Sequence, residues 1–385
     1  MGVRLLRRLE TPRNDNLQAM FAKALKYFDW LFFAGAILLS LTGLLMIYST
    51  GLSGTVERGL WVRQLVALSV GVGGLFLLSG LDYRFFRKNS SVLYLVAVAL
   101  LLVVLLFGED IRGSRRWFDF VFFNFQPAEF SKLALIVLLA KYFEMRHSLL
   151  PKFGFVLWSG LYVLVPAMLI ALQPDLGSAM VHIAVWLGML FVSAMPRRHF
   201  LYLLVGFLVL VALGWQFFFV EYQRDRIRSF MDPTADPLGR GYNVIQSIVA
   251  VGSGGWFGSG LARGLQSQLR FLPERQTDFI FASTAEELGF AGVSLVLALL
   301  GFLLFRMIKI QREARDLFGT YLASGIFFMI FTQSVVNIGM NLGFLPVTGI
   351  TLPFLSYGGS SLLVNFLLLG IMQNIARNSI PVRFV

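Results

Sequence analysis

Residues 200–220 read FLYLLVGFLVLVALGWQFFFV, and the polar run EYQRDRIR follows directly at 221–228. An uncharged apolar run of this length matches the roughly 20 residues that an α-helix needs to cross a bilayer. The polar character continues to residue 278, and a second long apolar run begins at Phe279. The chain is therefore expected to combine membrane-spanning helices with one long segment, residues 221–278, outside the membrane.

The composition of the whole chain agrees with a polytopic helical membrane protein. Of its 385 residues, 57% are hydrophobic and 14% are charged, which is far less charge than a soluble protein carries. The apolar runs are continuous instead of short and alternating, which excludes an outer-membrane β-barrel. The chain has no cysteine, so thiolate chemistry is excluded, and its histidines show no metal-binding spacing.

Ten apolar segments have the length and hydropathy of membrane helices. The predicted fold class is all-α, a polytopic integral membrane helical bundle of about ten transmembrane helices. A large extracytoplasmic loop, about residues 221–278, would connect the seventh helix to the eighth. The last predicted span holds Pro353 and two adjacent glycines, which imply a break or close packing. The ten spans are predicted at 30–49, 61–81, 91–108, 127–143, 154–172, 176–194, 200–220, 279–305, 318–340 and 352–376.

The placement of lysine and arginine sets the predicted orientation in a bacterial plasma membrane. With the N-terminus inside, most of the 33 basic residues fall in cytoplasmic segments, as the positive-inside rule requires. Residues 1–27 are then a basic cytoplasmic segment, 28–377 one transmembrane domain and 378–385 a cytoplasmic tail. The net charge of +12 follows from the same rule, and no nucleic-acid-binding motif accompanies it. We expect contacts with membrane lipids and none with nucleic acid.

Two basic clusters stay on the outward side, at residues 112–116 and within 221–278. As exceptions to the positive-inside rule they indicate a function, such as the binding of an anionic group. Arg115 and Arg116 carry guanidinium groups, which suit phosphate. In the long loop, Arg224 and Arg275 are further candidates.

A polar pair interrupts the fourth predicted span. Glu129 and Lys132 are three residues apart and therefore share one helix face. Glu129 near a helix start also suits the helix dipole, so a purely structural role is one interpretation. Ionisable residues inside a membrane segment, however, usually face a cavity or the bundle interior. We interpret both residues as substrate-binding candidates.

Two further motifs hold features of interest. In Gln173-Pro174-Asp175, proline followed by aspartate makes a good helix start, yet Asp175 can also line the outward cavity. In the long loop, residues 242–251 are predicted as a short amphipathic helix on the membrane, and the rest mostly as turns and glycine. The Gly-rich stretch at 252–260 does not match a dinucleotide-binding motif. Its glycines are expected to permit tight turns or close backbone approach to a ligand.

Asp278 stands where the chain re-enters the membrane, and it is the strongest catalytic candidate. The alternative is that Thr277 and Asp278 only cap the next helix. Glu286 would lie roughly 12 Å further along a continuous helix, at 1.5 Å per residue. That distance is too long for two carboxylates to share a proton. Asp278 would therefore act alone, with basic residues as its electrostatic complement.

Taken together, these motifs resemble the SEDS family, also called the RodA/FtsW/SpoVE family. The resemblance runs from about residue 30 to residue 377, with the motifs in matching order. The lead-in Gln266-Ser267-Gln268-Leu269 is most similar to the RodA, or elongation, branch, while Gln276 stands where the family commonly has histidine. The motifs are GSRRW at 113–117, FQPAEFSK at 125–132, QPDLG at 173–177, DPTADPLG at 232–239, FLPERQTDFIF at 271–281 and PFLSYGGSS at 353–361.

The resemblance implies a ten-helix peptidoglycan glycosyltransferase that polymerises lipid II into glycan strands during cell elongation and rod-shape maintenance. The family's essential aspartate corresponds to Asp278, and its sensitive glutamate and lysine correspond to Glu129 and Lys132. The resemblance also implies lipid II and the growing glycan strand as ligands. A class B penicillin-binding protein, a transpeptidase, would be the protein partner.

The residues themselves are compatible with this chemistry. A carboxylate such as Asp278 can activate the attacking sugar hydroxyl, and cations can stabilise the departing pyrophosphate. The transfer from the lipid-pyrophosphate donor is expected to invert the anomeric centre. The sequence identifies no definite cofactor, although a divalent cation, Mg²⁺ or Mn²⁺, at Asp278 can replace or assist the basic residues. One carboxylate alone makes a thin metal site.

Two other classes of function fit the same sequence. A flippase or transporter of a lipid-linked cell-wall precursor would also need a helix bundle with internal charges, but no polar path across the membrane is evident. A non-catalytic scaffold for a transpeptidase would tolerate removal of the charges at Asp278 and Lys132. Polymerisation of lipid II by the purified protein distinguishes the enzyme from both.

Overall fold

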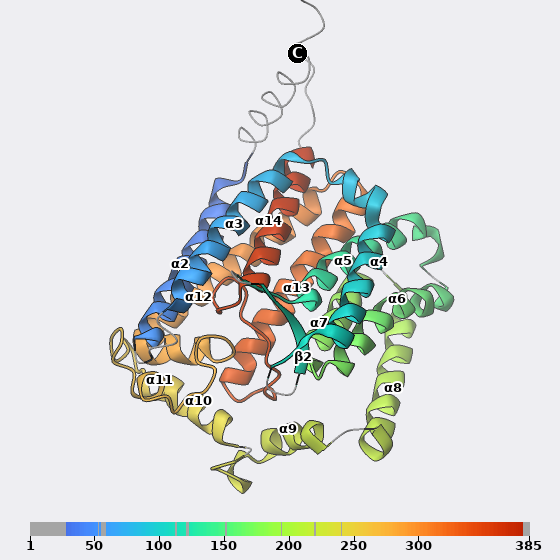
Figure 1. Ribbon diagram of the computed structural model, residues 1–385. Helices are drawn as coiled ribbons and strands as arrows, with labels where there is room; N and C mark the ends of the chain where they lie inside the picture. The colour runs from blue at the N-terminus through green and yellow to red at the C-terminus, as the bar shows by residue number, and fades with distance from the viewer. Residues whose placement is uncertain are drawn as a thin grey trace, which may run out of the picture.

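The computed structural model describes residues 28–52, 54, 59–111, 114–120, 123–150, 152–193, 195–218, 221–239 and 241–379. The predicted N-terminal segment and most of the predicted tail therefore lie outside the described residues. Within this part of the chain, ten helices of 17 or more residues correspond to the ten predicted spans (Figure 1). They are α2 (Trp30–Gly51), α3 (Leu60–Gly80), α4 (Arg84–Phe107), α5 (Pro127–Met145), α6 (Phe153–Leu172), α7 (Leu176–Val192), α8 (Arg197–Leu213), α12 (Ile280–Glu313), α13 (Leu317–Asn341) and α14 (Gly359–Ser379).

Seven of these helices are long and apolar enough to cross a membrane by length and composition alone. The other three, α5, α7 and α8, are shorter or carry more charge. The start of α2 and the end of α14 lie at one end of the bundle, which we call the terminal end (Figure 1). The segment between α8 and α12 lies at the opposite end, the loop end. The prediction of an all-α polytopic membrane protein is confirmed.

The centre of the bundle is formed by α5, α13 and α14. Most of the residues of these three helices are buried, whereas α3 and α4 expose many of their apolar side chains. A helix in the centre touches other helices on all sides and can carry charges that would be costly against lipid. This position explains why α5 is a bundle helix although it contains Glu129, Lys132 and Lys141.

The prediction of a last span that starts at residue 352 is wrong at its beginning, because α14 starts only at Gly359. Phe354 has a φ of 65°, which no helix residue adopts. The Ser356 hydroxyl accepts a hydrogen bond from the Leu352 backbone N–H at 2.8 Å and donates to the Thr277 carbonyl at 2.6 Å. Residues 342–358 therefore form a loop that is hydrogen-bonded to Thr277, just before α12.

The loop end contains more regular structure than the sequence indicates. A small antiparallel sheet in the order β1-β2-β3, which was not predicted, precedes α5. Residues 221–278 were predicted to be mostly turns and glycine, and this is wrong for α9. Within α9, the Arg228 guanidinium forms ion pairs with Glu221 at 2.6 Å and Asp225 at 3.3 Å, and these pairs stabilise the helix. The elements are β1 (Glu109–Ile111), β2 (Ser114–Phe120), β3 (Phe123–Phe125), α9 (Glu221–Met231), α10 (Tyr242–Ser253) and α11 (Leu265–Gln268).

The predicted helix at 242–251 is present as α10, and it packs against α12 and α13. Short turns join the remaining elements: η3 (His147–Leu149), the π turn η4 (Gly214–Phe218) and η5 (Pro233–Ala235). In α12 the helix is interrupted at Gly289, where φ is 66° and ψ is −166°. The first part of α12, from Ile280 to this break, is almost wholly buried at the loop end.

Candidate functional site

A cavity of about 510 Å³ opens at the loop end, among the elements that carry most of the predicted site residues. Its walls come from α3, β2, α5, α7 and α13, from the chain before α12, and from the loop before α14. Five predicted site residues line it: Arg116, Glu129, Lys132, Asp175 and Asp278. Tertiary structure thus brings together residues that are up to 162 positions apart, because the loop ends of these helices converge.

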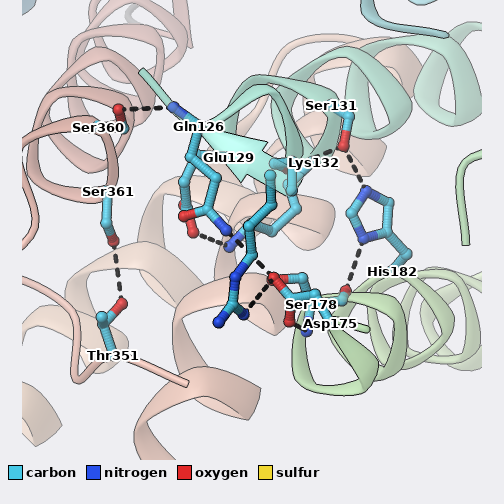
Figure 2. Close-up of polar contacts among 12 residues, drawn as sticks. Gln126, Glu129, Ser131, Lys132, Asp175, Ser178, His182, Thr351, Ser360 and Ser361 are labelled. Carbon is cyan, nitrogen blue, oxygen red and sulfur yellow. Dashed lines mark hydrogen bonds and ion pairs between the residues drawn. The ribbon is translucent and has the colours of Figure 1, made fainter. Parts of the chain in front are cut away.

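Glu129 and Lys132 form an ion pair on the cavity wall. The Lys132 ammonium donates to Glu129 Oε1 at 2.7 Å, and the two side chains are only 1% and 6% exposed (Figure 2). Pro127 starts α5 and places Glu129 in its first turn, one turn before Lys132. The second carboxylate oxygen, Oε2, is buried and has no hydrogen-bond partner among the described residues. A buried acceptor without a partner is costly, so this atom suits a donor on a bound ligand.

Asp175 joins the start of α7 to the region before α5. Its carboxylate accepts from the Ser178 backbone N–H at 3.0 Å and the Ser178 hydroxyl at 2.9 Å, which caps α7. It also accepts from Gln126 Nε2 at 3.1 Å and lies 3.6 Å from the Arg116 guanidinium (Figure 2). The predicted helix start and the predicted cavity position are therefore both correct for the same residue.

A buried histidine of α7 lies behind the ion pair and is hydrogen-bonded at both ring nitrogens. His182 Nδ1 is 2.7 Å from the Ser178 carbonyl, and Nε2 is 2.8 Å from the Ser131 hydroxyl (Figure 2). A carbonyl can only accept, so Nδ1 carries a proton. The Ser131 hydroxyl also lies 2.8 Å from the Ala128 carbonyl, and its single proton can be donated either to that carbonyl or to Nε2. His182 is fully buried and does not line the cavity, so its place in the bundle is that of a packing residue.

Asp278 lies half-buried on the cavity wall, just before α12. Its backbone carbonyl accepts from the side-chain amides of Asn337 and Asn341 of α13, at 2.9 and 3.0 Å. Gly349 lies close enough that a Cβ there would be 3.5 Å from Asp278 Oδ2. The N-cap of α12 is Phe279 and has no side-chain cap, so Asp278 is not the capping residue that the alternative interpretation required.

Hydroxyl groups join the start of α14 to the rest of the wall. Ser360 accepts from the Gln126 backbone N–H at 3.0 Å and donates to the Asn124 carbonyl at 2.6 Å. Ser361 and Thr351 are hydrogen-bonded at 3.2 Å, across the loop before α14 (Figure 2). These contacts place the PFLSYGGSS motif at the cavity, with no histidine beside its serines.

The structure places three other predicted residues elsewhere. The Arg275 side chain is 4% exposed, and its guanidinium donates to the Ser267 carbonyl inside the loop segment. Arg224 belongs to α9 and does not line the cavity. The side chain of Arg115 lies outside the described part of the structure. Arg275 is only three residues before Asp278, yet its side chain points away from the cavity and into the loop segment.

Arg63 and Tyr357 line the cavity and were not predicted. Burial raises the pKa of Tyr357, while the nearby Arg63 guanidinium lowers it only in part, so the hydroxyl stays a hydrogen-bond donor. Arg63 lies in the first turn of α3, at the loop end. In the predicted orientation, a basic residue at this end of an apolar span is an exception to the positive-inside rule, and this exception in the sequence could have identified Arg63 as a candidate.

The described cavity wall carries both signs of charge. Its cations are Arg63, Arg116 and Lys132, and its carboxylates are Glu129, Asp175, Glu274 and Asp278. Such a wall can hold an anionic group against the cations and still present a carboxylate to a hydroxyl. Among the described residues, no group of three or more Asp, Glu or His side chains is gathered in a way that could hold a metal ion.

Known proteins resemble this chain over most of its length. The model of the FtsW, RodA and SpoVE family, described as cell cycle protein, matches residues 29–380. Stage V sporulation protein E of Bacillus subtilis (strain 168) is 40% identical over 363 residues, which cover 89% of this chain and 95% of that protein. The peptidoglycan glycosyltransferase MrdB of Escherichia coli (strain K12) is 37% identical over 321 residues, covering 83% and 86%.

A solved chain from work on the structural coordination of polymerization and crosslinking by a peptidoglycan synthase complex shares the fold. It aligns with a TM-score of 0.77 at 36% identity, covering 91% of this chain and 98% of that chain. The family match extends over all the residues that line the cavity.

Proposed function

Because this chain belongs to the FtsW, RodA and SpoVE family of peptidoglycan glycosyltransferases, we propose that its cavity polymerises lipid II into glycan strands. The observation that supports this most is the joint presence of Asp278, Lys132 and Arg116 on one cavity wall. A lipid-linked sugar donor needs both a base and a site for pyrophosphate, and this wall offers both.

The proposed step is one displacement at the anomeric carbon of the donor sugar. The oxygen of an acceptor sugar hydroxyl attacks this carbon, and the bond from the carbon to the lipid-pyrophosphate oxygen breaks. The hydroxyl proton passes to the Asp278 carboxylate, and the electron pair of the broken bond leaves with the lipid pyrophosphate. Attack opposite the leaving group inverts the anomeric centre.

The cations of the wall would stabilise the charge that develops on the pyrophosphate. Lys132 is held by Glu129 and Arg116 by Asp175, so both cations are positioned before substrate arrives. Arg63 is exposed at the cavity and would add a third. A divalent cation, if it takes part, would be held by Asp278 and would help to stabilise the negative charge of the leaving group. Comparison of rates with and without EDTA tests this directly.

We place the loop end on the outer face of the plasma membrane, with both termini in the cytoplasm. The positive-inside distribution of lysine and arginine supports this orientation. The protein would work with a class B penicillin-binding protein, because the solved chain that shares its fold comes from a peptidoglycan synthase complex that couples polymerization to crosslinking.

The decisive experiment supplies the purified protein, reconstituted in vesicles, with lipid II and measures glycan polymer on gels. Asp278→Asn keeps the shape and removes the base, and we expect the rate to fall about 10²- to 10⁴-fold. Asp232→Asn is the matched control, a carboxylate in the same segment that is exposed and does not line the cavity. An Asp278→Asn variant that polymerises at the normal rate contradicts the proposal, and Asp278-independent scrambling of labelled lipid II would indicate a transporter.

The cellular role that we propose is elongation, on the basis of the RodA-like residues before Phe271. Expression of this chain in cells depleted of their elongation enzyme should restore rod shape. The same expression should fail to restore division in cells depleted of FtsW. Rescue of division alone would assign the chain to the division branch and leave the enzymatic proposal intact.

A further inference from the structure

The glycine-rich stretch at residues 252–260, after α10, does not line the cavity. It lies instead against the break in α12. A helix break leaves backbone N–H and C=O groups without intrahelical partners, which is costly in a membrane protein. Residues 255–260 supply these partners. The four bonds are Phe290 N to Gly255 O at 2.9 Å, Ala291 N to Trp256 O at 3.0 Å, Ser259 N to Glu286 O at 2.9 Å and Gly260 N to Glu287 O at 3.0 Å.

Glycine is required for this contact because the two backbones nearly touch. A Cβ at Gly254 would lie 1.9 Å from the Ala285 carbonyl oxygen, and one at Gly258 would lie 2.2 Å from the Glu287 carbonyl oxygen. The close approach that the sequence indicated is therefore an approach to α12 and not to a ligand. The segment is fixed rigidly at the level of residues 285–291.

The lengths of α2 and α12 indicate how far residues 285–291 lie from the terminal end of the bundle. At the terminal end, Arg306 of α12 pairs with Asp29, the N-cap of α2. From there, 19 residues of α12 lead to Glu287 and 20 of α2 lead to Ser49, roughly 28–30 Å each at 1.5 Å per residue. Ser49 and Glu287 are hydrogen-bonded to each other. The hydrocarbon core is about 30 Å thick. With the Arg306–Asp29 ion pair placed at one boundary of that core, this level falls at the other boundary, at the loop end.

The segment at this boundary exposes large apolar side chains. Trp256, Phe257 and Leu265 are 72%, 84% and 69% exposed. The Trp256 ring packs against Phe290 at 5.2 Å, and Phe290 begins the exposed apolar side of α12, which continues to Leu297. Arg263 and Arg270 are exposed in the same segment. The patch is thus continuous with the lipid-facing surface of the bundle.

We infer that residues 256–269 form an interfacial anchor whose apolar side chains contact the acyl chains at the loop end. The two arginines would lie at the phosphate level, where lipid headgroups are anionic. Tryptophan and phenylalanine at this depth match the aromatic belt of membrane proteins, and arginine beside them can reach the headgroups. The anchor holds the start of α12, and with it Asp278, at a constant height above the membrane.

The absence of cysteine makes this inference open to a clean test. Phe257→Cys and Leu265→Cys are spin-labelled in the full chain in phosphatidylcholine–phosphatidylglycerol vesicles, and collision rates with oxygen and with a water-soluble nickel chelate are measured. Leu297→Cys on α12 is the control in the membrane. Leu238→Cys, 90% exposed and just after the acidic residues Asp232 and Asp236, is the control in water.

We expect both anchor labels to collide with nickel several-fold less often than the label at 238. Their oxygen-to-nickel ratio should fall between those at 238 and 297, as for a site near the hydrocarbon boundary. Two labelled positions are used so that the test does not depend on one variant that folds poorly. Variants that still synthesise polymer are taken as folded. If both labels are as accessible to nickel as that at 238 in the protein alone, the inference is overturned, and the patch would be left to a protein partner.

Discussion

The buried pair Glu129–Lys132 allows stability and catalysis to be separated by a double-mutant cycle. Its atoms are 2.7 Å apart, and the side chains are 6% and 1% exposed. Removing one partner of such a pair leaves an uncompensated buried charge and costs about 3–5 kcal/mol, whereas neutral replacement of both is often nearly neutral. We therefore expect Lys132→Met and Glu129→Gln each to lower the free energy of unfolding by about 3–5 kcal/mol.

The double variant Glu129→Gln/Lys132→Met should lose about 1 kcal/mol or less. Unfolding is followed by circular dichroism as SDS is added to protein in mixed micelles, and polymerisation of lipid II is measured on the same preparations. Lys141→Met is the control, a half-buried lysine at the other end of α5, with an expected change within about 0.5 kcal/mol.

The activity of the double variant decides between two roles of the pair. If Lys132 stabilises the leaving pyrophosphate, the double variant regains stability but stays inactive. If the pair only holds α5 in the bundle, polymerisation returns together with stability. A single variant that loses less than about 1 kcal/mol would refute the energetic reasoning itself.

Two further variants test how the loop end is held. Gly258→Ala should lower the free energy of unfolding by about 2 kcal/mol or more, because φ is 75° and its Cβ would meet Glu287 O at 2.2 Å. Gly252→Ala, with open space around it, should change it by less than about 1 kcal/mol in chemical unfolding. Asn341→Ala should cost about 1–3 kcal/mol and lower kcat with little change in KM, because Asn341 holds the Asp278 backbone from outside the cavity. A larger effect on KM than on kcat would argue against that positioning role.

The membrane helices could be predicted from sequence because hydropathy and helix length are local properties. An uncharged run such as residues 200–220 leaves the backbone no alternative to a helix in lipid. The same approach was wrong at residues 352–358, since their hydropathy fits a span while Phe354 and Ser356 commit the chain to a loop. It also missed the sheet before α5, in which β1 and β3 have only three residues each and are too short to show a pattern.

The candidate site was predicted in part, and the reason differs between residues. Glu129, Lys132 and Asp175 stand out because charge in an apolar segment is costly unless it is used or paired. Arg275 was a candidate as one of the basic residues of the outward loop, but its side chain turns to the Ser267 carbonyl. Nearness in sequence does not set the direction of a side chain in a loop, where successive residues can point to opposite sides.

The sequence by itself determined that this chain crosses a membrane many times and keeps two groups of charge at one end. Those conclusions depend on the cost of transferring each segment into lipid, which is a sum over neighbouring residues. Only the tertiary structure decided that Arg116, Asp175 and Asp278 share one cavity, and that the glycine-rich stretch closes a break in α12. These facts depend on which helix ends meet in space, because contacts between residues distant in the chain are fixed by packing of the whole bundle.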